Sequence, residues 1–211
     1  MKKIITIIGA RPQIIKSSAI NRAIKIKYSD KLTEIIVHTG QHYDENMSNV
    51  FFDEMGIPYP NYNLAVGSGS HGAQTAKMLE GLEEIFISEK PDAVLVYGDT
   101  NSTIAGALAA SKIHIPLIHV EAGLRSFNKS MPEEINRISC DHMSTMLFSP
   151  TNTGLENLKK EGFNISNKGK ATIDNPFVYH CGDIMYDNSL YFSEVSDEKS
   201  TILNELGLEK N

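Results

Sequence analysis

Polar residues able to do chemistry follow predicted strands of this sequence at the points where those strands end. The cations Arg11 and Lys16 follow the first apolar run, and the carboxylates Asp99 and Glu121 follow two later runs. A third carboxylate, Glu133, opens the next predicted helix. The loops at the carboxyl ends of strands in an open α/β sheet share one edge, where ligands bind. We therefore predict one site that combines cations for an anionic ligand with carboxylates for proton transfer.

The elements that must position these residues are short β-branched runs alternating with longer amphipathic stretches. The predicted strands cover Lys3–Gly9, Thr33–His38, Ala93–Tyr97, Leu117–His119, Thr145–Phe148 and Phe177–Cys181. The predicted helices cover about Gln13–Tyr28, Asn46–Met55, Gly72–Ser88, Ser102–Lys112, Glu133–Met143, Thr153–Glu161 and Tyr186–Phe192. This alternation is typical of βαβ units and predicts an α/β fold, a Rossmann-like parallel sheet with helices on both faces.

The alternating pattern stops before the sequence does. Residues 1–192 are predicted to form one Rossmann-like domain, because they contain every strand–helix unit. From about Ser193 the sequence is rich in charge and poor in core residues. We therefore expect residues 193–211 to form a linker or a single helix that leads to a second domain.

The composition is that of an ordinary globular protein, with 41% hydrophobic and 22% charged residues among 211. The net charge of −6 argues against a general nucleic-acid binder, because any phosphate site must then be local. The apolar run near Met1 is too short to cross a membrane, so a cytoplasmic protein without membrane attachment is expected. Cys140 and Cys181 lack the spacing of a metal site, and both are expected to be reduced and mostly buried.

The segment GARPQIIK, residues 9–16, is predicted to bind phosphate. Gly9 allows a sharp turn after the strand, and Pro12 suits the first turn of a helix. The helix N-terminus then presents N–H groups and a positive dipole beside Arg11 and Lys16. The segment is neither a GxGxxG motif nor a Walker loop, which argues against an ordinary dinucleotide or NTPase site. The alternative is a plain strand-to-helix turn with solvated cations.

Asp99 and Glu121 each have a structural alternative. Asp99 is a candidate N-cap of the helix that follows it, as are Thr100 and Asn101. Glu121 follows a buried strand, where a carboxylate is costly unless it is paired. Arg125 is a candidate partner for Glu121, or a ligand for a substrate phosphate.

Glu133 lies in SMPEEINR, where helix capping is an alternative to catalysis. Ser130 and Glu133 have the S-x-x-E spacing of a capping box. Glu134 and Arg137 have the spacing of an i,i+3 ion pair. All of these alternatives involve local structure, whereas a functional interpretation requires that the motifs meet in space.

Gln41 and His42 follow another predicted strand, in the segment TGQHYDENM. Their place at a strand end makes them candidates for substrate binding, although a lone loop histidine is more often simply solvated. No single motif decides the function. The coincidence of four motifs at one edge of the sheet favours a functional site over the structural alternatives.

The motifs also occur in an order that matches a known family. With GARPQIIK, GQHYDENM, VLVYGDT, HVEAGLR, MPEEINR, FSPT and CGDIMYD in succession, the chain closely resembles the non-hydrolysing UDP-N-acetylglucosamine 2-epimerases. The resemblance extends from residue 1 to about residue 192, and HVEAGLR followed by PEEINR is its most specific part.

The resemblance implies the N-terminal half of a GT-B fold, in which the active site lies between two Rossmann-like halves. It implies conversion of UDP-GlcNAc to UDP-ManNAc by elimination and re-addition of UDP, without cofactor or metal. Members of the family are much longer, so the 211-residue chain alone is expected to be inactive, and the full-length protein to be a homodimer. The motif match assigns acid/base roles to Asp99, Glu121 and Glu133, and substrate contacts to Arg11, Lys16, Gln41, His42, Arg125 and Arg137.

Two positions depart from the commoner bacterial pattern, which has Thr and Glu where this chain has Ala10 and Gln13. The departure leaves room for a related UDP-2-acetamido sugar as the substrate. A hydrolysing relative that releases ManNAc is a second alternative, and a nucleotide-sugar binding module without catalysis is a third. A GT-B glycosyltransferase is a further alternative by fold analogy, which is weak evidence for function.

Overall fold

Seven parallel strands form the centre of the molecule in the computed structural model, which describes residues 1–41 and 51–208. Their order is β3-β2-β1-β4-β5-β6-β7, and every neighbouring pair is parallel. The strands are β1 (Lys2–Ile8), β2 (Leu32–His38), β3 (Tyr62–Asn63), β4 (Ala93–Tyr97), β5 (Leu117–Val120), β6 (Met146–Ser149) and β7 (Phe177–His180). The Rossmann-like α/β fold predicted from the sequence is confirmed.

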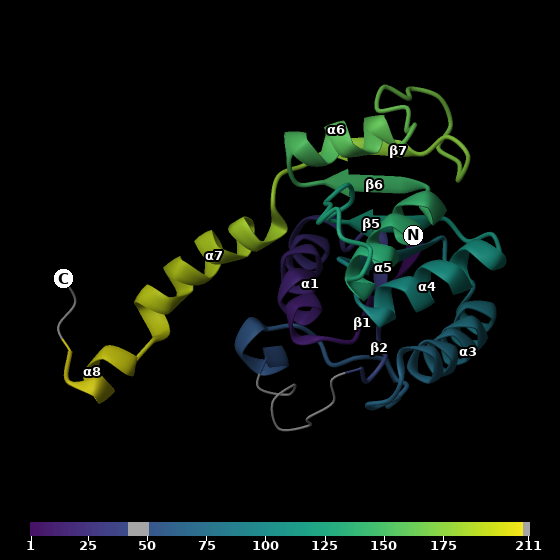
Figure 1. Cartoon of the computed structure of the whole chain (residues 1–211). Helices are drawn as coiled ribbons and strands as arrows, with labels where there is room; N and C mark the ends of the chain where they lie inside the picture. The colour runs from purple at the N-terminus through teal and green to yellow at the C-terminus, as the bar shows by residue number, and fades with distance from the viewer. Residues whose placement is uncertain (42–50, 209–211) are drawn as a thin grey trace.

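Helices connect the strands and cover the sheet (Figure 1). They are α1 (Arg11–Ala23), α3 (His71–Glu89), α4 (Asn101–Lys112), α5 (Pro132–Met143), α6 (Asn152–Lys160), α7 (Ile184–Lys199) and α8 (Ile202–Leu206). A short π-helical segment, η1 (Ile24–Tyr28), extends α1. Residues 51–55 are also helical, and the rest of the helix predicted over Asn46–Met55 lies outside the described residues.

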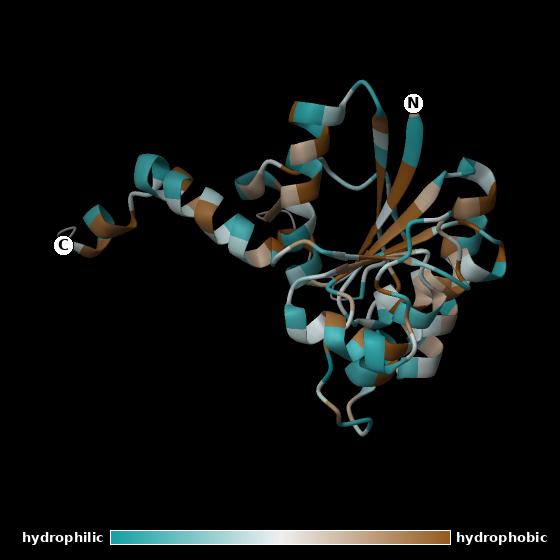
Figure 2. Ribbon diagram, turned by 90° about the horizontal axis from the view of Figure 1, so that it is seen from above, coloured by the Kyte–Doolittle hydropathy of each residue, from teal (hydrophilic) through white to brown (hydrophobic). Residues whose placement is uncertain are grey.

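The central strands β1 and β4 are buried on both faces, as parallel strands between two helical layers must be. On one face, Ile5 and Val94 pack in a cluster with residues of α3 and α4 such as Met78. On the other face, Leu95 lies in a second cluster with Ile20 of α1. Figure 2 shows the hydrophobic strands gathered at the centre of the body.

Helix α7 starts beside α1 and then leaves the body of the domain, with α8 beyond it (Figure 1). Asn188 anchors it, because its side-chain amide donates to the Ile15 carbonyl at 2.7 Å and its oxygen accepts from Ser18 at 3.0 Å. The Arg22 guanidinium lies 3.6 Å from the Tyr191 ring centroid. Because α7 runs on to Lys199, it is longer than the predicted helix Tyr186–Phe192, and no break marks the predicted domain boundary after residue 192.

Most predicted elements are confirmed with ends shifted by one or two residues. Strand β3 was missed because it has only two residues, which carry no alternating pattern. The first helix becomes π-helical after Ala23, which its sequence did not indicate. Cys140 is buried as expected, but the expectation that Cys181 is mostly buried is wrong, because it lies exposed after β7. No described helix is long and apolar enough to cross a membrane.

Candidate active site

The loops after β1 and β4 lie side by side where the order of the sheet reverses, which is where open α/β sheets bind ligands. Gly9 ends β1 in a space that no other residue fits, because a Cβ there would lie 2.1 Å from both Thr39 Oγ1 and Ser102 Oγ. Gly98 follows β4 with a φ of 62°, in the left-handed region that favours glycine. We call the loops after β1, β4 and β5, with the start of α5, the strand-end edge.

Gln13 fixes the loop after β1 to the end of β4. Its side-chain oxygen accepts hydrogen bonds from the Gly9 N–H at 2.9 Å and the Ala10 N–H at 3.1 Å. Its amide nitrogen donates to the Tyr97 carbonyl at 2.9 Å and to Thr103 Oγ1 at 3.0 Å. Gln13 is 1% exposed, so a neutral side chain joins the two loops in the interior.

Lys16 and Glu121 form an ion pair across the edge, from α1 to the loop after β5. Their side chains are 13% and 15% exposed, so the pair is reachable but largely shielded from water. Glu121 adopts a φ of 74°, which costs a non-glycine residue about 1–3 kcal/mol and occurs mostly at functional sites. The predicted alternative pair of Glu121 with Arg125 is wrong. Arg11 starts α1, with its guanidinium 5.3 Å from the Phe51 ring centroid.

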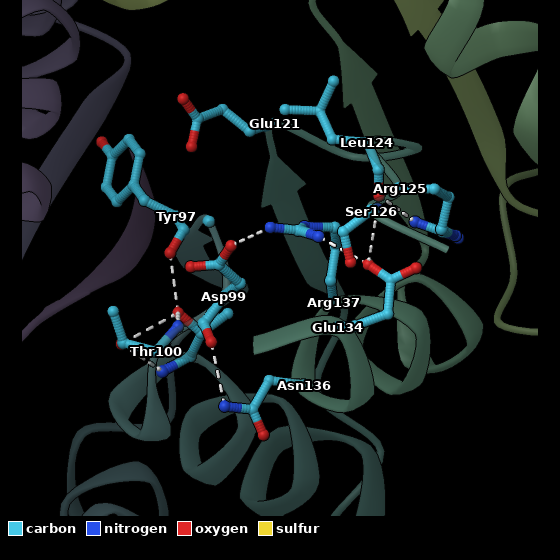
Figure 3. Close-up of polar contacts among 12 residues, drawn as sticks. Tyr97, Asp99, Thr100, Glu121, Leu124, Arg125, Ser126, Glu134, Asn136 and Arg137 are labelled. Atoms are coloured by element: carbon cyan, nitrogen blue, oxygen red, sulfur yellow. Dashed lines mark hydrogen bonds and ion pairs between the residues drawn. The ribbon is translucent and has the colours of Figure 1, made fainter. Parts of the chain in front are cut away.

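Asp99 pairs with Arg137, and the two side chains point toward each other in Figure 3. The guanidinium of Arg137 also contacts Glu134 at 2.6 Å, which confirms the predicted i,i+3 pair. Asp99 does not cap α4, because the Thr100 side chain accepts the hydrogen bond from the Thr103 N–H. The carbonyl of Asp99 accepts from Asn136 at 2.9 Å, so its backbone is held as well.

Two successive glutamates of α5 have different environments. Glu134 is 1% exposed and accepts from the backbone N–H groups of Ser126 and Phe127, each at 2.9 Å. Burial acts to raise the pKa of Glu134, but these hydrogen bonds outweigh it and lower the pKa below its ordinary value. Glu133 is exposed, and among the described residues it has no hydrogen-bond or ion-pair partner.

The predicted capping box of Ser130 with Glu133 is wrong. The helix begins at Pro132, so its N-cap is Met131, which has no side-chain capping bond. Because Glu133 lies in the first turn and caps nothing, its carboxylate remains available for another role.

Gln41, which follows β2, lies beside the strand-end edge, where its side-chain oxygen accepts from the Ser102 N–H at 3.0 Å and the Ser102 hydroxyl at 2.8 Å. In this conformation it therefore provides a hydrogen-bond acceptor for an N–H group in the first turn of α4. His42 lies outside the described residues.

Arg125 points into the protein, away from Glu121. Its side chain is 1% exposed and contacts Asp141 at 2.7 Å and Glu161 at 2.6 Å. The other oxygen of Asp141 lies 2.7 Å from the ring of His119. Arg125 is predicted to contact the substrate, but in this conformation its guanidinium is bound within a buried network of charges.

The sequence prediction missed His119, Asp141 and the role of Gln13. A polar residue within an apolar strand, such as His119, needs a buried partner, and that was the available signal. Glu134, Arg137 and Asp141 recur at spacings of three and four, which puts a polar stripe on the core side of α5.

An apolar pocket of about 420 Å³ adjoins the edge on the α1 side of the sheet. Ile20, Leu95, Val120 and Phe148 contribute to its walls, and Glu121 is one of its few polar lining residues. Among residues 1–41 and 51–208, no group of three or more His, Cys, Asp or Glu side chains could hold a metal ion. The edge therefore offers paired cations and carboxylates beside an apolar surface.

A family model described as UDP-N-acetylglucosamine 2-epimerase matches residues 24–211. The chain belongs to this family. A UDP-N-acetylglucosamine 2-epimerase homolog of Methanococcus maripaludis is 54% identical over 99% of this chain and 54% of its own length. A UDP-2,3-diacetamido-2,3-dideoxy-D-glucuronate 2-epimerase of Pseudomonas aeruginosa is 55% identical over 91% of this chain and 51% of its own length.

Solved structures of the family share the fold. The UDP-GlcNAc 2-epimerase of Methanocaldococcus jannaschii, in complex with UDP-GlcNAc and UDP, superposes with a TM-score of 0.86 and 43% identity. The match covers 98% of this chain and 53% of that protein. The chain thus spans about half the length of the relatives that it matches.

Proposed function

We propose that this chain is the acid/base half of an enzyme that inverts C2 of a UDP-2-acetamido sugar, with UDP-GlcNAc and UDP-ManNAc as the substrate pair. The observation that carries the proposal is that two cation–carboxylate pairs, Lys16–Glu121 and Arg137–Asp99, lie at one strand-end edge. Membership of the epimerase family supports the same conclusion.

The first half of the reaction breaks the C1–O bond to UDP and removes the C2 proton. The bond electrons leave with UDP, a base takes the proton, and 2-acetamidoglucal remains. Arg11 and Lys16 stabilise the departing diphosphate, together with the positive end of the α1 dipole. A carboxylate beside the ring stabilises its developing positive charge.

The second half re-adds UDP to C1 and delivers a proton to the opposite face of C2. Two groups must therefore exchange protons on the two faces of the sugar. Asp99, Glu121 and Glu133 supply the candidate carboxylates, and Arg137 and Gln41 hold the segment that carries Asp99.

We also propose that residues 1–192 form one domain, that 193–211 lead to a second Rossmann-like domain, and that the complete protein is a cytoplasmic homodimer. On this view the 211-residue chain binds UDP-sugars weakly and turns none over. The proposal is supported by the relatives, of whose length this chain covers only about half.

A chimera tests the function. The chain is joined to the part of the M. maripaludis homolog that it does not cover, and the products formed from UDP-GlcNAc are separated by chromatography. We expect UDP-ManNAc from the chimera and no product from the 211-residue chain. Free ManNAc would instead identify a hydrolysing enzyme, and tight binding without product would support a binding module.

Matched variants of the chimera test the carboxylates. Asp99→Asn, Glu121→Gln and Glu133→Gln are each expected to lower turnover by about 10²- to 10⁴-fold, the usual contribution of an acid/base group. Glu84→Gln, an exposed carboxylate on α3, is the control. Near-native turnover in all three variants would show that these residues have only structural roles.

A related uronate sugar is a second candidate substrate. The Pseudomonas relative named for UDP-2,3-diacetamido-2,3-dideoxy-D-glucuronate is as similar to this chain as the M. maripaludis homolog is. The same chimera assayed with both sugars compares them directly, and the larger kcat/KM identifies the substrate.

A further inference from the structure

Three charged side chains among the described residues are almost completely buried yet lie next to the strand-end edge. His119 on β5 and Asp141 on α5 are both 0% exposed, and the side chain of Arg125 is 1% exposed. Buried charges are costly unless they are paired, and these three are paired with one another. Glu161, which is partly exposed, completes the network through Arg125.

The ring of His119 lies between two hydrogen-bond acceptors. Its Nδ1 is 2.7 Å from the carboxylate of Asp141, and its Nε2 is 2.8 Å from the carbonyl of Gly98. A carbonyl oxygen and a carboxylate both accept, so both ring nitrogens must donate. This geometry requires the doubly protonated, positively charged imidazolium.

The electrostatic environment agrees with this protonation state. Burial alone would lower the pKa of His119, but Cys140 and the Asp141 carboxylate raise it well above its ordinary value. Burial likewise opposes ionisation of Asp141, yet His119 and Arg125 lower its pKa. Alternating charges therefore run from His119 through Asp141 and Arg125 to Glu161, with the His142 ring 3.7 Å beyond.

Each end of the His119–Asp141 pair holds the backbone of a different loop. His119 donates to the carbonyl of Gly98, the residue directly before Asp99. Asp141 accepts from the N–H of Gly123 at 3.0 Å, two residues after Glu121. These segments, residues 98–101 and 121–125, are here called the two carboxylate loops.

We propose that His119 and Asp141 form one positioning unit that fixes the two carboxylate loops at a constant spacing. The inference rests on the proposed function, because it gives the unit a purpose only if Asp99 and Glu121 act on one sugar. Neither His119 nor Asp141 touches the substrate. The unit acts through backbone hydrogen bonds, and its charge is balanced inside the protein.

A local feature explains why such a unit is needed. Glu121 and Gly123 both adopt left-handed φ values, of 74° and 80°. A loop with this conformation persists only where its surroundings impose it. The bond from Gly123 to Asp141 is one of the contacts that impose it, and the paired N–H groups of Glu121 and Ala122 on the Phe148 carbonyl are others.

The first test is NMR on the 211-residue chain, which requires no activity. Long-range ¹H–¹⁵N spectra of His119 at pH 7.5 are expected to show both ring nitrogens protonated. His142, which is exposed, serves as the internal reference. A neutral His119 tautomer would overturn the proposal without any variant.

The second test uses carboxyl ¹³C resonances of Asp99 and Glu121 in the same chain. His119→Gln and Asp141→Asn are each expected to move both resonances, although the His119 ring bonds only to the backbone of the first loop and the Asp141 carboxylate only to that of the second. Glu34→Gln, at a partly buried carboxyl bonded to Thr6 and Asn21, is the control for general destabilisation and is expected to move neither. Unchanged resonances in a folded His119→Gln protein would contradict the proposal.

The chimera then links position to catalysis. His119→Gln is expected to lower kcat by about 10²-fold with KM nearly unchanged, since small misplacements of reacting groups cost about that much. Glu34→Gln is expected to keep its kcat. If the wild-type chimera is inactive toward every UDP-sugar, the proposed function fails, while the two NMR tests still decide the positioning unit.

Discussion

The loop after β1 and the loop after β5 face the same edge but are held by different chemistry. Gln13 fixes the first through four neutral hydrogen bonds. Ions fix the second, because Asp141 holds the Gly123 N–H and is itself paired with His119 and Arg125. One loop is stabilised without charge and the other by buried charge.

The difference matches what each loop is proposed to do. A loop that binds a diphosphate needs the positive potential of a helix N-terminus, and a neutral amide fixes it without cancelling that potential. A loop that carries a reacting carboxylate needs a set position more than a potential, and short ionic hydrogen bonds give the stricter geometry. The predictions below test this contrast, from the largest expected effect to the smallest.

Removing a charge that holds the loop after β5 is expected to lower the free energy of unfolding the most. Asp141→Ala leaves His119 and Arg125 as buried charges with a missing partner, so we expect a loss of about 3–5 kcal/mol in the free energy of unfolding. Urea denaturation monitored by circular dichroism measures it. A loss below about 1 kcal/mol would show that the network contributes little.

Removing the neutral side chain that holds the loop after β1 is expected to lower the free energy of unfolding by less. Gln13→Ala removes the partner of two buried N–H groups and one of the two donors to the Tyr97 carbonyl, which we expect to cost about 1–3 kcal/mol. The same denaturation experiment compares the two variants. A Gln13→Ala loss larger than that of Asp141→Ala would reverse the contrast between the loops.

Of the two loops, only the one held by buried charges is expected to make a contribution to stability that depends on pH. The pKa of His119 is raised in the folded state, so its stabilisation is complete below the unfolded pKa of about 6.5 and is lost as the pH rises toward the folded pKa. Between those values the free energy of unfolding falls by about 1.4 kcal/mol per pH unit for one proton. His119→Gln is expected to flatten this decline, whereas Gln13→Ala shifts the whole curve down.

At acid pH, the free energy of unfolding is expected to show a smaller change with the opposite dependence on pH. The pKa of Glu134 is lowered, so its stabilisation is present above the unfolded pKa of about 4.3 and is lost as the pH falls through the folded pKa. Glu134→Gln is expected to flatten the acid decline, whereas Gln13→Ala, which removes no titratable group, is expected to leave its slope unchanged. Equal slopes for the two variants would contradict the contribution of Glu134.

Surface pairs set the lower limit of the comparison. Lys2 and Asp92 pair at 2.6 Å with side chains 74% and 39% exposed. Such pairs contribute about 0–1 kcal/mol, and salt weakens them further. Lys2→Ala is therefore expected to lower the free energy of unfolding by less than Asp141→Ala or Gln13→Ala does. A larger effect of Lys2→Ala in 0.5 M salt than at low salt would contradict this prediction.

The fold was predictable because hydrophobic periodicity is a local property of the sequence. Runs such as IITIIG and AVLVYG, apolar on both faces, identified β1 and β4, and the helices between them set a parallel sheet. The two-residue strand β3 has no periodicity of its own, and only its pairing with Val37 and His38 of β2 identifies it as a strand.

The position of the candidate residues at one edge of the sheet was predictable, but their pairings were not. Strand ends placed Asp99 and Glu121 at one edge, since topology alone determines that. Which cation meets which carboxylate depends on helix phase and rotamer. The sequence therefore leaves Arg125 as a candidate partner for Glu121 or for a substrate phosphate, whereas in the structure it turns inward to Asp141. The choice between Glu133 and Glu134 as the exposed residue likewise depends on where α5 begins, at Pro132.

The most direct test of the central claim is proton exchange at C2. The chimera is incubated with UDP-GlcNAc in D₂O, and ¹H NMR follows the C2 signal of the sugar. We predict that UDP-ManNAc forms with deuterium at C2, and that Glu133→Gln slows both the epimerisation and the exchange. UDP-ManNAc that keeps its C2 proton would contradict the account, because no carboxylate at this edge would then exchange that proton with solvent.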